Sequence, residues 1–175
     1  MHDNPDMRLY AFLLFLHVLA AVIWVGGMFV MHFAVRPSAV ELLPPPQRLP
    51  LMAATLRRFF GWVTLAVLTV LISGLLMFFG IGMAAGAMSA GKNAFVEGLR
   101  LAHVSIHAMF AVGLVMMAIY AHIRTAPFKR LQKAVAAQDW AAAAPQLDQI
   151  RVLVATNLVL GVIVIGVATL GRALL

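Results

Sequence analysis

Four long apolar runs constrain this chain more than any other feature of its sequence. The runs are 9–35, a segment within 59–90, 101–123 and 152–171, each bounded closely by Arg or Lys. Each reaches the roughly 20 residues that an α-helix needs to cross the hydrocarbon core of a bilayer. Hydrophobic residues make up 63% of the 175 residues and charged residues only 11%. A soluble core in so short a chain does not absorb four such segments, so the sequence predicts an integral membrane protein.

We predict one all-α membrane domain over residues 1–175. It is an integral membrane four-helix bundle with spans at about 9–35, 59–80, 99–123 and 151–172. The loop between spans three and four places basic residues on one helical face, which predicts an amphipathic surface helix on the cytoplasmic side.

The other connections differ in character. Between spans one and two, Pro44 to Pro46 predict a rigid extended stretch. The segment 49–58 that follows predicts a short amphipathic lead-in at the surface. Between spans two and three, the loop 80–93 is rich in Gly, Ala and Met, which predicts either a flexible cap or a loose connector.

The placement of positive charge predicts the topology. Nine of the 13 Lys and Arg residues lie in the first and third loops, and four lie in the second loop and near the two termini. By the positive-inside rule, the two basic loops are cytoplasmic and both termini are periplasmic, in a bacterial-type cytoplasmic membrane. The net charge of +7 is then explained by anionic lipid headgroups, so no nucleic-acid partner is predicted.

Other residues exclude several functions. The chain has no cysteine, so thiolate metal sites, iron–sulfur clusters and thioether-linked haem are excluded. No nucleophile–base pair, phosphate loop or carboxylate pair is visible, which argues against hydrolytic and phosphoryl-transfer chemistry. Span two has no ionisable residue and is predicted to serve packing. In span four, Asn157 is predicted to bond across helices, and the glycines suit packing within the chain or a homodimer interface.

Histidines within the spans lie in runs one and three only. The first run carries His17 and His32, and the third carries His107 and His122, and the two members of each pair are fifteen positions apart. Fifteen residues of α-helix give a rise of about 22 Å and a rotation of about 60°. Spans one and three cross the membrane in the same direction, so the two pairs can face each other at two matching depths.

Two facing histidines are suitable axial ligands for a low-spin haem iron. We predict two haems b per chain, an outer one held by His17 and His107 and an inner one held by His32 and His122. Haem propionates need cations near the membrane surface. The cations placed at the span ends are Arg36, Arg124 and Arg100.

His103 leaves alternatives open. It lies four residues before His107 on the same helical face, so either can be the outer ligand. The longer spacing from His103 to His122 moves the outer haem toward the surface, which favours His107. His103 can instead bond a propionate or move protons for a quinone. A pair of histidines four residues apart also suits copper or zinc.

The residues around His17 read LHVLAAVIWVGGMF, with Trp24 seven residues on and Gly27 ten on. This pattern resembles the first span of the CopD-like membrane proteins and, more distantly, that of the HemJ-type protoporphyrinogen oxidases. YAH at 120–122 is a looser match in the third span. The resemblance implies a four-helix membrane protein with His17 as a ligand of a b-type haem. The CopD name implies copper handling.

One residue departs from the HemJ-type pattern. Those proteins have a lysine just after a histidine early in the third span, whereas Val104 and Ser105 follow His103 here. The departure argues against porphyrinogen oxidation.

The leading hypothesis from the sequence is a membrane b-type cytochrome. It carries electrons between a quinol or a soluble redox partner and a second acceptor. If the protein is an enzyme, this hypothesis makes it a quinone-linked oxidoreductase. The alternative is copper transport or binding, based on His103 with His107, on the eleven methionines, and on Met83 and Met88 in the outer loop. A HemJ-like haem-dependent oxidase is a further alternative.

Overall fold

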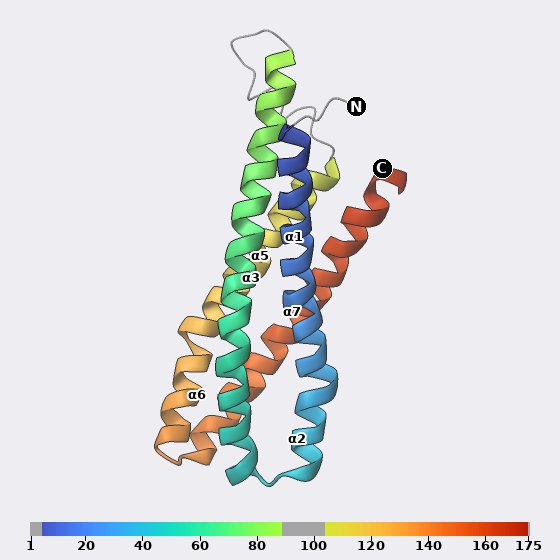
Figure 1. The fold of residues 1–175 in the computed structure, drawn as a ribbon. Coiled ribbons are helices and arrows are strands. Elements are labelled where there is room, and N and C mark those ends of the chain that lie inside the picture. The colour runs from blue at the N-terminus through green and yellow to red at the C-terminus, as the bar shows by residue number, and fades with distance from the viewer. Residues whose placement is uncertain (1–4, 89–103, 175) are drawn as a thin grey trace.

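The computed structural model describes residues 5–88 and 104–174, and in these ranges almost every residue is helical (Figure 1). Four of the described helices are long and apolar enough to cross a membrane. This confirms the predicted all-α membrane bundle. The elements are α1 (Pro5–Val30), η1 (Met31–Val35), α2 (Arg36–Leu42), α3 (Pro45–Met88), α5 (Val104–Thr125), α6 (Pro127–Ala136) and α7 (Trp140–Leu174).

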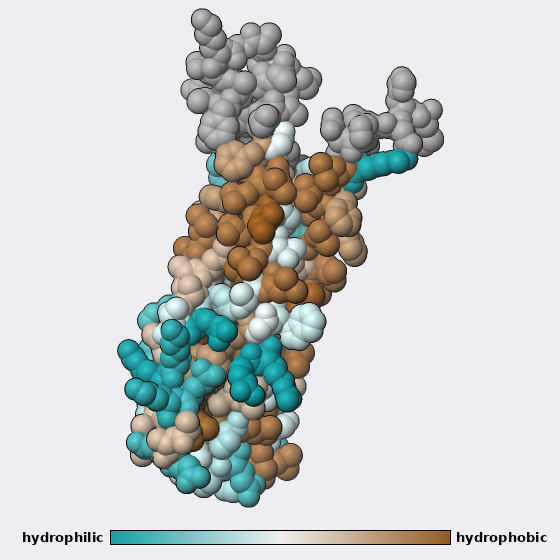
Figure 2. Space-filling model, turned by 60° about the vertical axis from the view of Figure 1, so that its left-hand side comes forward, coloured by the Kyte–Doolittle hydropathy of each residue, from teal (hydrophilic) through white to brown (hydrophobic). Residues whose placement is uncertain are grey.

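The helices pack as two pairs. α1 lies along α3, and α5 lies along α7, which also packs against α6. The start of α1 and the end of α7 lie at one end of the bundle, while α2 and α6 lie at the other (Figure 1). We call this second end the basic end, because hydrophilic side chains gather over it (Figure 2). Its cations are Arg36, Arg48, Arg57, Arg58, Arg124, Lys129, Arg130, Lys133 and Arg151.

A wide helical turn separates α1 from α2. In η1 the backbone N–H of Arg36 bonds the carbonyl of Met31, which is the five-residue spacing of a π-helix. Pro37 explains the turn, because proline has no N–H and its ring clashes with the carbonyl four residues earlier. A π-helical turn holds one more residue than an α-helical turn, and beyond it the chain continues as α-helix to Leu42.

The prediction of a rigid extended stretch at Pro44–Pro46 is wrong. Only Leu43 and Pro44 are non-helical, and α3 begins at Pro45. Proline is tolerated in the first turn of a helix, where the backbone N–H groups have no intrahelical partner. The carbonyl of Pro44 accepts the N–H groups of Gln47 and Arg48, which closes this turn.

The predicted lead-in at 49–58 is continuous with α3 rather than a separate element, and it is amphipathic as predicted, since Arg57 and Arg58 are exposed on one face. Leu49, Met52 and Leu56 are buried. At its other end α3 continues to Met88, so most of the predicted loop 80–93 is helical. Residues 89–103 lie outside the described residues.

The basic end has a closely packed core. The predicted amphipathic helix is confirmed as α6, and its apolar face packs on the bundle. Phe128 and Leu131 of α6 have 0% of their surface exposed, and Phe60 of α3 has 1%. The rings of Phe60 and Phe128 meet edge to face, with centroids 4.9 Å apart. Apolar burial of this kind holds α6 against α3 and α7.

Polar side chains join the helices near the middle of the bundle. The Tyr120 hydroxyl donates to the carbonyl of Phe60, at 3.0 Å, and lies 2.6 Å from the Thr64 hydroxyl. On the other pair, the Asn157 amide donates to the carbonyl of Met116 at 3.3 Å. This is the cross-helix bond predicted for Asn157. In a bilayer such bonds are retained because no water competes for the same groups.

Gly27 permits the close approach of α1 and α3. A Cβ at this position would lie 2.6 Å from the Phe59 ring, whereas a Cβ at Gly26 would have nothing within 4 Å. We expect Gly27→Val to lower the thermal unfolding midpoint in detergent, followed by circular dichroism, by several degrees, because overpacking costs about 1–3 kcal/mol. The matched variant Gly26→Val should unfold close to the wild-type temperature. Equal losses in the two variants would contradict this packing.

Candidate functional site

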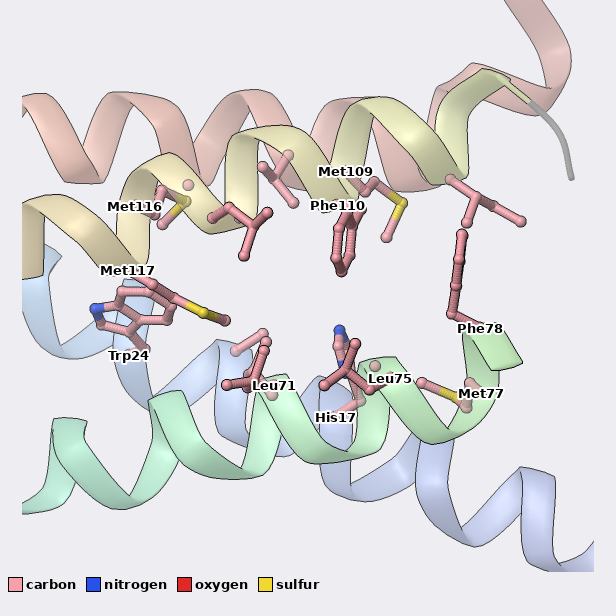
Figure 3. Close-up of a pocket in the computed structure, with 18 of the residues that line it drawn as sticks. His17, Trp24, Leu71, Leu75, Met77, Phe78, Met109, Phe110, Met116 and Met117 are labelled. Carbon is pink, nitrogen blue, oxygen red and sulfur yellow. The ribbon is translucent and has the colours of Figure 1, made fainter. Parts of the chain in front are cut away.

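A cavity of about 250 Å³ lies between α1, α3, α5 and α7, in the half of the bundle away from the basic end. Its wall is almost entirely apolar. Aromatic rings come from three helices, and Phe78 and Phe110 are stacked with centroids 5.6 Å apart. The residues shown in Figure 3 include Trp24, Leu71, Leu75, Met77, Phe78, Met109, Phe110, Met116 and Met117.

Among the described residues of this wall, His17 is the one with an ionisable nitrogen. Among the described residues that line the cavity, no other His and no Asp, Glu, Lys or Arg is present. The imidazole projects from α1 into the space between α3 and α5 (Figure 3). Because an ionisable group is costly within a bilayer, an imidazole in this position indicates a functional site.

A hydrogen bond from span two holds the imidazole. His17 Nδ1 lies 2.9 Å from the hydroxyl oxygen of Ser73. Ser73 is buried, and its hydroxyl donates to the carbonyl of Thr69 one turn earlier. A hydroxyl has one proton to give, so its oxygen accepts the proton of His17 Nδ1–H. This arrangement favours the tautomer in which Nε2 carries a free lone pair.

Gly74 leaves space for the ring in this orientation. A Cβ at Gly74 would lie 3.1 Å from His17 Cε1. Such a contact is tight enough to push the imidazole away from Ser73. Span two therefore supplies both the hydrogen bond and the space that direct Nε2 into the cavity.

Four thioethers share the wall with the imidazole. Met77 comes from α3, and Met109, Met116 and Met117 come from α5. Thioether sulfur is a soft, neutral ligand, and Met has three rotatable bonds that let the sulfur adjust its position. Imidazole nitrogen and thioether sulfur are both donors that suit a soft metal ion, and Figure 3 shows the thioethers spread along the wall, with Met117 toward one end and Met77 toward the other.

The cavity is open toward the lipid-facing surface. Several lining residues are themselves substantially exposed, among them Leu14 at 43%, Leu114 at 45% and Ile165 at 47%. These residues come from α1, α5 and α7. The cavity wall is therefore partly open to the surface of the bundle at these residues.

The other predicted histidine ligands lie elsewhere. His32 is half-buried in η1, with its ring edge to face on Phe33 at 4.8 Å. His107 is exposed on α5, 6.0 Å from the Phe78 ring, and is not among the described residues that line the cavity. His122 is exposed near the end of α5. His103 lies outside the described residues.

The structure does not bring the predicted histidine pairs into contact. In the described part of the chain, no hydrogen bond or ring contact joins His17 to His107 or His32 to His122. The pairing therefore stays a prediction. The loop methionines Met83 and Met88 lie near the end of α3, with side chains outside the described residues.

The arginines predicted to bind propionates have other neighbours. Arg36 lies 3.5 Å from the Asp148 carboxylate. Arg124 lies over the Phe128 ring, 5.6 Å from its centroid. Neither lines the cavity that contains His17. Arg100 lies outside the described residues.

Comparison with known proteins identifies the family. The model of the family described as Copper resistance protein D matches residues 53–170, which is more than half of the chain. The chain belongs to the CopD family. This confirms the predicted resemblance to the CopD-like proteins. The match covers most of α3, α5, α6 and most of α7, and the predicted binding of b-type haem stays a prediction. No curated protein and no solved structure gives a significant match.

Sequence analysis missed Ser73 and Gly74, because span two carries no ionisable residue. A serine followed by a glycine in a long apolar run was the available signal, since a buried hydroxyl within a bilayer needs a partner. Which partner it takes depends on the rotation of α1 against α3.

The Ser73 bond predicts a single imidazole tautomer at His17. In ¹⁵N-histidine-labelled protein in nanodiscs, long-range ¹H–¹⁵N spectra should show His17 with a protonated Nδ1 and a bare Nε2. Ser73→Ala removes the acceptor and should populate both tautomers, while Ser73→Thr keeps the hydroxyl and the wild-type pattern. His17→Gln assigns the signal. A protonated Nε2 in the wild type would contradict the assignment.

Proposed function

We propose that this CopD-family protein binds copper(I) within the membrane, with copper as its cargo. One observation supports this most strongly: the His17 imidazole, in a hydrogen bond with Ser73 that favours a free lone pair on Nε2, projects into a cavity whose wall holds four thioethers. Soft neutral ligands favour Cu(I) over harder cations. The family description, which refers to copper resistance, supports the same metal.

The composition of the wall also argues against harder cations. Ca²⁺ and Mg²⁺ require oxygen ligands, and structural zinc sites use several Cys, His or carboxylate ligands. The described residues contain no group of three or more His, Cys, Asp or Glu that could hold a metal. The sulfur atoms and the single imidazole of this wall are neutral ligands, which favour a soft monovalent ion.

The distribution of charge supports an orientation. With the basic end in the cytoplasm of a bacterial-type inner membrane, both termini lie in the periplasm. The His17 cavity then lies in the outer half of the bilayer. Copper(I) would reach it from the periplasmic side, which suits a protein that receives copper from outside the cell.

The proposal predicts that copper binding depends on His17. Purified protein should bind Cu(I) in competition with bathocuproine disulfonate, and His17→Ala should weaken binding about 100-fold or more, because losing a ligand costs more than losing an outer-shell partner. His107→Ala is the matched control, since this exposed imidazole should leave affinity unchanged. Equal affinity in the wild type and His17→Ala would overturn the assignment.

The thioethers give a second prediction. Met109→Leu combined with Met117→Leu conserves volume and removes two sulfur atoms, so Cu(I) affinity at the His17 site should fall about tenfold. Met28→Leu is the control, because Met28 is buried but does not line the cavity. Unchanged affinity in the double variant would remove the thioethers from the ligand set.

A second candidate function uses the same cavity. A space of about 250 Å³ with aromatic rings on three sides suits a flat apolar group, and an imidazole with one nitrogen anchored is a suitable axial ligand. We propose haem b, whose porphyrin ring is such a group, in a cytochrome that exchanges electrons with a quinol or a redox partner. The predicted pair of haems would use His107, His32 and His122 as further ligands. Haem b would supply one-electron redox chemistry.

The visible spectrum separates the two candidates. A reduced-minus-oxidised spectrum with sharp α and Soret bands, lost in His17→Ala, would establish haem b in the cavity. Two haems per chain, one of them lost in His32→Ala and in His122→Ala, would support the predicted pairs. We expect no haem bands and copper bound through His17. Haem bands without copper binding would instead make haem b the preferred ligand and copper(I) the second candidate.

A further inference from the structure

His107 lies beside the wall of the His17 cavity, at the end away from the basic end. The imidazole is exposed on α5, three residues after this helix begins at Val104. Its ring meets the ring of Phe78 on α3 edge to face, with centroids 6.0 Å apart. Phe78 lines the cavity, and Figure 3 shows it at the same end as Met77. His107 therefore contacts a lining residue from outside the described lining.

The spacing along α5 places His107 on the side where the cavity wall is partly open. Phe110 and Leu114 follow His107 by three and seven positions, so the three side chains share one side of the helix. Phe110 and Leu114 line the cavity and are 39% and 45% exposed. The imidazole thus extends this half-open row of side chains toward the start of α5.

Soft donors continue inward from this position. Met109 and Met117 are eight positions apart on α5, which is about 12 Å of helix rise. Along the cavity, Met77 lies toward one end and Met117 toward the other, with His17 between them (Figure 3). A series of donors of this length suits an ion that moves from one donor to the next, and His107 is placed at the start of the series.

We propose that His107 captures copper(I) at this end of the cavity and passes it toward His17. The identity of the ion rests on the proposed function. Imidazole nitrogen is a ligand that suits copper, and the exposed ring of His107 is open to an approaching ion. The step is a ligand exchange, in which the bond between copper and His107 breaks as a bond to a cavity donor forms. The oxidation state of the ion does not change.

A capture residue and a ligand of the bound ion have opposite effects on the rate of release. Loss of a capture residue raises the barrier between the free and the bound ion. Entry and release then slow by the same factor, and the affinity stays constant. Loss of a ligand of the bound ion destabilises the bound state, so release becomes faster and the affinity falls.

The test measures both rates on the full-length protein in nanodiscs. Copper-loaded protein is mixed with excess bicinchoninate, and the colour of the Cu(I)–bicinchoninate complex gives the release rate. The same complex mixed with excess copper-free protein gives the entry rate. His107→Leu should slow both rates about tenfold, a barrier change of about 1.4 kcal/mol, with the affinity unchanged. His107→Met keeps a soft donor and should retain most of the wild-type rates.

Ala111→Leu is the matched control. This exposed residue lies one turn further along α5 and outside the described lining, so the variant adds the same apolar side chain without removing a donor. Wild-type rates in His107→Leu would overturn the capture role and leave the proposed function standing. Faster release with weaker binding would do the same, because His107 would then be a ligand of the bound ion. No Cu(I) binding by the wild type would overturn both.

Discussion

The hydroxyl of Tyr120 connects the two helix pairs at the level where the bundle changes from closely packed to hollow. It bonds the carbonyl of Phe60 on α3, and its ring meets the ring of Trp24 on α1 edge to face. Trp24 lines the cavity, whereas Phe60 belongs to the core of the basic end. With no water in the bilayer core to replace this bond, the three helices stay in register at the floor of the cavity.

The two halves of the bundle have different tasks because they are packed differently. At the basic end, α6 fills the space between α3 and α7, and its buried rings leave room for a pocket of about 30 Å³ only. In the other half no such helix is present among the described residues, and side chains alone surround about 250 Å³. Stability is thus concentrated in one half, which leaves the other free to keep an open, ligand-sized space.

The spans could be predicted from the sequence, because the thickness of a bilayer fixes the length and composition of a crossing helix. His17 could be singled out from the sequence, since an imidazole within a span needs a reason, and the structure places it in the wall of the cavity; its role as a ligand stays a prediction. The hydrogen-bond partner of His17 could not be predicted. That depends on the rotation of α1, which places His17 against Ser73 of α3. The π-turn before Pro37 adds one residue to a helical turn, so a spacing argument based on regular helix does not fix where His32 faces relative to His17.

The exposure of lining residues such as Leu14, Leu114 and Ile165 makes the bilayer itself a competitor for the cavity. An acyl chain is as apolar as this wall and is present at very high local concentration, so it competes with any ligand for the space. Binding is then an exchange, in which the ligand must displace a hydrocarbon tail. Chain length and unsaturation of the surrounding lipids thereby set part of the apparent affinity. The same protein in two membranes of different lipid composition would have two different working affinities.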